Sequence, residues 1–115
     1  MINCAGIATP AKVIGKTGPM LIEDFVRVIH VSLVGTMNVI RLVVFHMRDN
    51  IPGEDGEKGV VINTSSTAAF EGQIGQPAYS ASKAGVAGVT LTLPGSLPIM
   101  ESEWSPSHRD YLILR

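Results

Sequence analysis

The sequence has little charge, few aromatic side chains and a single cysteine. Of its 115 residues, 17% are charged and 5% are aromatic. Cys4 is the one cysteine, which excludes an intrachain disulfide and a multi-cysteine metal site, so we predict no metal site. The 9 basic and 10 acidic residues give a formal net charge of -1. This balance provides no general attraction for nucleic acid or an anionic membrane, and we predict neither partner.

Long uncharged segments are also scarce. The longest one, Ala84 to Met100, is too short to cross a bilayer comfortably and contains Pro94 and Pro98, so we predict no transmembrane helix. The residues after Met1 lack the basic and then apolar run of a secretory signal. The hydrophobic content of 45% is nevertheless enough for a folded core. A chain of this length forms one domain at most.

Two helices and a buried strand are predicted from hydrophobic spacing. Apolar residues three and four apart predict a helix over about 21–48, within which Gly35 suggests close packing against a neighbouring element. A β-branched run at 59–64, continuously apolar at its centre, predicts a strand covered on both faces of a parallel sheet. Pro77 precedes a second predicted helix over about 78–93. This alternation of helices and strands indicates an α/β fold.

Three polar residues form the most informative pattern. Tyr79 and Lys83 lie four apart on a predicted helix, so the ammonium can approach the phenol and stabilise its phenolate form. Ser66 follows the predicted strand and would point into the crevice where open α/β sheets bind ligands. A Tyr/Lys pair alone also arises by chance on solvated helix faces. The additional serine at a strand end favours a catalytic site.

These motifs resemble those of the short-chain dehydrogenase/reductase family. Asn3-Cys4-Ala5-Gly6 is similar to the end of the family's Asn-Asn-Ala-Gly motif, and 59–66 is similar to its strand with the catalytic serine. Tyr79-Ser80-Ala81-Ser82-Lys83 matches its Tyr-x-x-x-Lys signature. The resemblance covers about residues 2–93. It implies a partial Rossmann-type doubly wound parallel sheet, with 1–93 as the middle part of the catalytic domain.

The resemblance also implies roles for individual residues. Tyr79 would be the general acid/base, Lys83 would assist it and bind the nicotinamide ribose, and Ser66 would polarise the substrate carbonyl. The reaction would be hydride transfer between NAD or NADP, with NAD favoured, and a secondary alcohol or ketone such as a 3-hydroxyacyl-CoA or a steroid. Members form homo-oligomers, and the compartment would be the cytoplasm or the mitochondrion. The residues expected at the cofactor are Asn3, Ala5, Gly6, Ser65, Tyr79 and Lys83.

Two departures from the family pattern qualify these roles. Ser32 occupies the position of an Asn that helps hold a proton-relay water, so we include Ser32 among the catalytic candidates. The glycine-rich turn that binds the cofactor pyrophosphate does not occur in these 115 residues, and we expect the isolated chain to be inactive. Two alternatives therefore stay open, a non-catalytic fragment and a module that oligomerises through its helices.

The last residues, 94–115, follow neither the helical nor the strand period. We predict that this tail is irregular and is encoded out of frame. Codons for Met100-Glu101-Ser102-Glu103-Trp104, read from the third base, allow Gly-Ile-Arg-Val. The same shifted frame through Leu112 allows Val-Ala-Ile-Ala-Pro-Gly-Leu-Phe, which resembles the family's next strand and its Pro-Gly turn.

Overall fold

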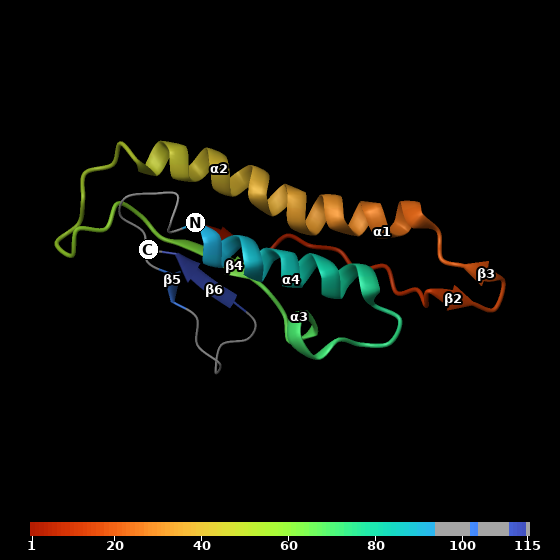
Figure 1. Ribbon diagram of the computed structural model, residues 1–115. Coiled ribbons are helices and arrows are strands. Elements are labelled where there is room, and N and C mark those ends of the chain that lie inside the picture. The colour runs from red at the N-terminus through yellow and green to blue at the C-terminus, as the bar shows by residue number, and fades with distance from the viewer. Residues whose placement is uncertain (94–101, 104–110, 115) are drawn as a thin grey trace.

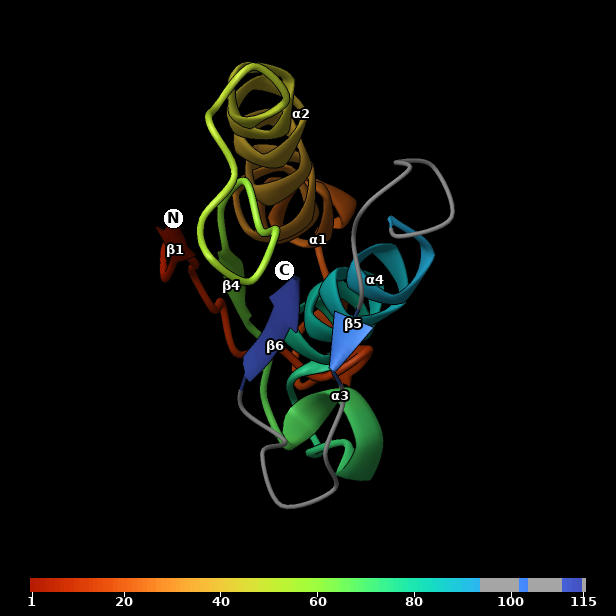
Figure 2. The same ribbon diagram turned by 90° about the vertical axis from the view of Figure 1, so that its left-hand side faces the viewer.

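The computed structural model describes residues 1–93, 102–103 and 111–114, and it contains a four-stranded sheet and two long helical segments that pack beside each other (Figures 1 and 2). The strand order in the four-stranded sheet is β1-β4-β6-β5, and a separate hairpin pairs β2 with β3. The strands are β1 Ile2–Asn3, β2 Ile14–Gly15, β3 Gly18–Pro19, β4 Val61–Thr64, β5 Ser102–Glu103 and β6 Tyr111–Leu114. The helices are α1 Ile22–Ile29, η1 His30–Val34, α2 Gly35–Met47, α3 Ala68–Glu71 and α4 Pro77–Thr92.

The strands β1 and β4 are parallel neighbours joined by the long helical segment, which makes a βαβ unit. Ile2 pairs with Ile62 and Asn3 with Asn63. The long helix predicted over 21–48, the strand within 59–64 and the second helix over 78–93 are thus confirmed, with small shifts at their ends. The α/β fold class is confirmed as well.

The long helical segment Ile22–Met47 is also apolar enough to cross a membrane. Its mean hydropathy reaches 1.9 over an 18-residue window, although the segment contains charged residues such as Arg27 and Arg41. The strands that precede and follow it pair directly with each other, so its role in this fold is that of a crossover between neighbouring strands. The predicted absence of a membrane partner stays a prediction.

A π-helical turn interrupts this segment at its middle. The Gly35 backbone N–H bonds the carbonyl of His30, five residues earlier, where an α-helix would use the residue four earlier. The expectation that Gly35 allows close approach of a neighbouring element was wrong: a Cβ there would meet only the His30 carbonyl, at 3.5 Å. Single π turns are rare in proteins, and a large share of those that do occur lie at functional sites. This one contains Ser32.

The helix α4 packs against α1, η1 and β4, beside the long segment (Figures 1 and 2). The close approach falls at Gly85, where an added Cβ would lie 2.6 Å from Leu33 Cδ2 of η1. Under α2, the fully buried Ile40 and Val61 form a small core. The partly buried residues packed on this core are Met1, Val44, Met47 and Leu93.

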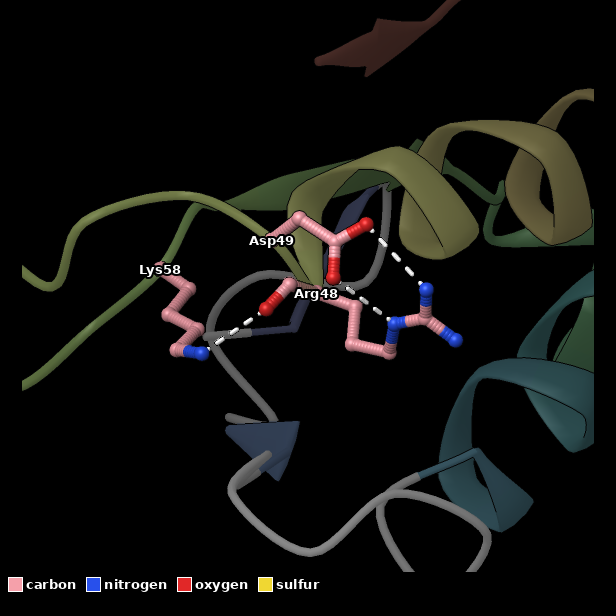
Figure 3. Close-up of polar contacts among 3 residues, drawn as sticks. All are labelled: Arg48, Asp49 and Lys58. Atoms are coloured by element: carbon pink, nitrogen blue, oxygen red, sulfur yellow. Dashed lines mark hydrogen bonds and ion pairs between the residues drawn. The ribbon is translucent and has the colours of Figure 1, made fainter.

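The loop after α2 is held by polar contacts at the end of that helix (Figure 3). Lys58 Nζ donates to the carbonyl of Arg48 at 2.7 Å, and Asn50 Nδ2 donates to the carbonyl of Lys58 at 2.8 Å. Arg48 donates to both carboxylate oxygens of Asp49, at 3.0 and 3.1 Å. This hydrogen bonding lowers the pKa of Asp49. Lys58 therefore satisfies a helix-end carbonyl and directs the chain back toward β4.

Within the tail, the expectation of irregular structure was wrong for two short segments. β6 lies antiparallel to β4, with Val61 opposite Leu114, and β5 pairs antiparallel with β6. The exposed edge of β4 needs hydrogen-bond partners, and Tyr-Leu-Ile-Leu at 111–114 has high strand propensity. The antiparallel direction also departs from the expected all-parallel sheet. The other tail residues, 94–101, 104–110 and 115, lie outside the described residues.

Candidate functional site

Tyr79 and Lys83 lie one turn apart on α4, as their spacing predicts. Lys83 Nζ is 5.7 Å from the centroid of the Tyr79 ring. The lysine is only 4% exposed, and its Nζ donates to the carbonyl of Thr64 at 2.7 Å. Pro77 is the first residue of α4, where the missing N–H costs no hydrogen bond because the first N–H groups of a helix have no partner within it. Its fixed φ angle also favours the helical conformation at the start of α4. The ammonium is thus held between the phenol and the end of β4.

Ser66 lies two residues after the last residue of β4. Its Oγ accepts a hydrogen bond from the backbone N–H of Ala68 at 3.2 Å, at the beginning of α3. The helix α3 packs on α4, so Ser66 and Tyr79 come from neighbouring elements. The convergence of the Ser66 hydroxyl and the Tyr79 phenol on one substrate atom stays a prediction.

The neighbouring Ser65 is buried and bonded. It is 3% exposed, and its Oγ donates to the carbonyl of Lys83 at 3.2 Å. This hydroxyl therefore points to α4. A contribution of Ser65 to the cofactor groove stays a prediction.

Burial dominates the electrostatics of Lys83. Removal from water penalises the charged ammonium and lowers the pKa of Lys83, while its interaction with Cys4 acts in the opposite direction. Cys4 is exposed at the end of β1, and its Sγ accepts a hydrogen bond from Thr64 Oγ1 at 3.6 Å. Lys83 is therefore a buried titratable group held at the end of β4.

The residues after β1 provide an accessible backbone beside Lys83. Ala5 and Gly6 are exposed, whereas Asn3 is half-buried. A Cβ added at Gly6 would lie 3.5 Å from Ser32 Oγ and 3.7 Å from Lys83 Nζ. The small residues Ala5 and Gly6 leave this ridge open to a ligand, and the ammonium supplies a hydrogen-bond donor next to it. This donor set fits a ribose or a similar polyhydroxyl group.

Ser32 lies in the π turn and faces the same loop. It is 1% exposed, its Oγ accepts from the Ile7 N–H at 3.1 Å, and it donates to the Ile7 carbonyl at 3.3 Å. The hydroxyl has a single proton, and the bond to the Ile7 carbonyl uses it, so Ser32 has no donor left for another group in this arrangement. The structure therefore brings Ser32, Gly6 and Lys83 together. The catalytic and cofactor-binding roles of these residues stay predictions.

Reasoning from the sequence missed Asn63 and Thr90, which are fully buried polar residues next to the site. Asn3 Nδ2 donates to Asn63 Oδ1 at 2.7 Å, and Asn63 Nδ2 donates to Thr90 Oγ1 at 3.1 Å. One signal was available. Asn63 interrupts the apolar run of a strand predicted to be covered on both faces, and such an amide needs buried partners.

Comparison with known proteins gives consistent matches. The chain is 54% identical over 101 residues to 3-hydroxyacyl-CoA dehydrogenase type-2 of Bos taurus, which covers 86% of this chain and 39% of the relative. The Homo sapiens protein of the same name is 53% identical over 98 residues, covering 84% and 38%. The chain thus spans about two fifths of the length of these relatives.

Solved structures match the same region. The crystal structure of 3-hydroxyacyl-CoA dehydrogenase type-2 from Mycobacterium avium has a TM-score of 0.76 and 39% identity, covering 81% of this chain and 37% of that one. A short chain dehydrogenase from Mycobacterium smegmatis has a TM-score of 0.71 and 28% identity, covering 83% and 36%. The family model described as short chain dehydrogenase matches residues 1–98. This chain therefore belongs to the short chain dehydrogenase family.

Proposed function

We propose that this chain is the catalytic segment of an oxidoreductase that transfers hydride between NAD(P) and a secondary alcohol or ketone. The observation that carries the proposal is the arrangement of Tyr79 and Lys83. The buried ammonium lies 5.7 Å from the phenol ring and beside the open backbone of Gly6. Family membership and the names of the similar relatives support the same reaction class.

Tyr79 is the general acid/base in this proposal. It moves the proton of the substrate hydroxyl while Ser66 hydrogen-bonds the same oxygen. Lys83, anchored on the Thr64 carbonyl, stabilises negative charge on the phenol and donates to the ribose. Asn3, Ala5, Gly6 and Ser65 form the neighbouring wall. The nicotinamide, when bound, supplies the hydride chemistry.

Ser32 acts through the Ile7 backbone in this proposal. Its donor is bonded to the Ile7 carbonyl, and its side chain is closed to solvent. It therefore holds the loop at Gly6 in place beside Lys83. A proton-relay water would have to bind a backbone group of the π turn.

The finer assignments follow the relatives. Five similar proteins, of animals from Drosophila melanogaster to Homo sapiens, have the name 3-hydroxyacyl-CoA dehydrogenase type-2. We therefore infer a 3-hydroxyacyl-CoA thioester as the substrate class, in preference to a steroid. The preference for NAD over NADP is proposed from the family resemblance of the motifs alone.

The test places residues 1–93 of this chain in the human 3-hydroxyacyl-CoA dehydrogenase type-2, in place of the corresponding segment. This graft is expected to oxidise a 3-hydroxyacyl-CoA with NAD. Tyr79→Phe should lower kcat by about a hundredfold or more, because general acid/base catalysis contributes at least that factor. Lys83→Met should also lower kcat. Lys58→Met removes another lysine that bonds a carbonyl and should leave kcat unchanged.

The result that contradicts the proposal is a graft that folds and binds NADH yet does not turn over substrate. Equal activity of the parent graft and its Tyr79→Phe variant would contradict it as well. Binding of NADH, measured by fluorescence, separates a failed active site from a failed fold.

A second candidate function is helix-mediated oligomerisation. Val31, Val34 and Leu42 of the long helical segment are between 41% and 47% exposed, and Leu91 of α4 is 50% exposed. Exposed apolar side chains on two helical segments supply apolar surface that association with another protein could bury. Sedimentation of the purified chain tests it, because a monomer at high micromolar concentration would contradict a homo-oligomer.

A further inference from the structure

Three consecutive residues at the end of β4 bond to α4, and we call these contacts the β4–α4 ladder. Asn63 Nδ2 donates to Thr90 Oγ1, and Ser65 Oγ donates to the backbone carbonyl of Lys83. Between them, the carbonyl of Thr64 accepts from Lys83 Nζ. Asn63, Thr90, Ser65 and Lys83 are all buried. The ladder therefore joins the strand to the helix at two positions seven residues apart.

The ladder contacts the same face of α4 that presents Tyr79. With about 3.6 residues per turn, residues 79, 83, 86 and 90 lie along one side of a helix. Lys83, Val86 and Thr90 are buried on this side. A slip of α4 by one residue would move Thr90 by about 1.5 Å and turn its face by about 100°. Such a slip would rotate Tyr79 and Lys83 by the same angle at the same time.

Apolar side chains would fill the positions of Asn63 and Thr90 with no need for partners. A buried amide costs free energy unless it is bonded, and replacing a bonded polar pair by apolar groups of the same shape can be nearly neutral. Packing alone thus explains neither residue. The hydrogen bond between them selects one register of the helix against the strand. In any other register the Asn63 amide, which is 0% exposed, would lose this partner and would have no water to replace it.

We propose that Asn63 and Thr90 are positioning residues that fix the register of α4 against β4 and so hold Lys83 Nζ in its buried place. Asn3 extends the chain of bonds to β1, since its Nδ2 donates to Asn63 Oδ1 at 2.7 Å. The strand end at Gly6 and the helix with Tyr79 are thereby connected through a single amide. The consequence for catalysis rests on the proposed function, whereas the placement of Lys83 does not.

The test measures acetylation rates of individual lysines in the full 115-residue chain by mass spectrometry. Thr90→Val keeps the shape of the side chain but removes the hydroxyl, which accepts from Asn63 and also donates to the Val86 carbonyl within α4. Losing the bond from Asn63, the one of these two that joins α4 to β4, should raise the labelling rate of Lys83 about tenfold. Thr90→Ser retains the hydroxyl and should restore the parent rate. Thr92→Val is the matched control, because within the described part of the chain Thr92 Oγ1 bonds the Val89 carbonyl of its own helix.

Lys58 is the internal reference, since it also donates to a carbonyl but contacts the end of α2. Its labelling rate should stay unchanged in every variant. The inference is overturned if Thr90→Val leaves Lys83 as slow as in the parent, or if Lys58 accelerates equally. Should Thr90→Val unfold, the paired variant Asn63→Val with Thr90→Val restores an apolar core. Slow labelling of Lys83 in that folded variant overturns the inference, and fast labelling supports it.

These outcomes are independent of turnover. Failure of the graft to oxidise substrate would contradict the proposed function and leave the lysine rates as they are. In an active graft, Thr90→Val should lower kcat with little change in KM for the acyl-CoA. Thr90→Ser should restore kcat.

Discussion

Gly85 should tolerate an added methyl group less well than Gly88 of the same helix. A Cβ at Gly85 would lie 2.6, 3.1 and 3.4 Å from Cδ2, Cδ1 and Cγ of Leu33, whereas a Cβ at Gly88 has nothing within 4 Å. Three atoms of one side chain are involved, so rotation of a single methyl group does not remove the clash. Gly85→Ala therefore forces Leu33 or the whole of α4 to move.

The magnitude follows from two opposing effects. Overpacking costs about 1–3 kcal/mol, and replacing a helical glycine by alanine gains about 1 kcal/mol. Leu33 is half-buried and can yield partly, so we expect a net loss of about 1 kcal/mol for Gly85→Ala. Gly88→Ala has only the favourable effect and should increase the free energy of unfolding by about 0.5–1 kcal/mol.

Urea denaturation of the full chain, followed by far-ultraviolet circular dichroism, measures both changes. A second background identifies the cause. When Leu33 is first changed to alanine, Gly85→Ala should become stabilising by about the same amount as Gly88→Ala. If Gly85→Ala stabilises the chain as much as Gly88→Ala does while Leu33 is present, the close approach of α4 to η1 is refuted.

Three further predictions concern ionisation, cofactor and coding sequence. Burial lowers the pKa of Lys83, so the unfolded chain binds more protons between that pKa and about 10.5, and stability should rise with pH in this window. In urea denaturation at several pH values, Lys83→Met should abolish this increase of the free energy of unfolding with pH. The same increase in the variant as in the parent would contradict the prediction. The 115-residue chain alone should not bind NADH at micromolar concentration, because it holds no glycine-rich pyrophosphate turn, and a saturable fluorescence titration would refute this. Sequencing the coding DNA of 94–115 should give codons that yield Ile-Ala-Pro-Gly in the shifted frame.

The fold could be predicted from the sequence where hydrophobic spacing is regular. The long helix, the apolar strand and the second helix all follow from side-chain period, and the apolar centre of the strand favours parallel pairing, which β4 has with β1 but not with β6. The π turn could not be predicted in this way, because His30-Val31-Ser32-Leu33-Val34 fits an α-helical period as well. The pairing of β6 with β4 was also missed, since it depends on an open strand edge far away in the chain.

The candidate site shows the same division between local and distant contacts. The Tyr79 and Lys83 pair is local, so its spacing alone places both side chains on one face. Gly6, Ser32 and Lys83 meet only in three dimensions, where the end of β1, the π turn and α4 come together. Asn63 and Thr90 determine that meeting through buried hydrogen bonds 27 residues apart in the chain. A buried polar residue inside an apolar strand is thus a sequence signal that a partner exists, while the identity of the partner requires the fold. For this chain the partner is Thr90, on the helix that carries Tyr79, so this buried polar pair also sets the geometry in which the site can act.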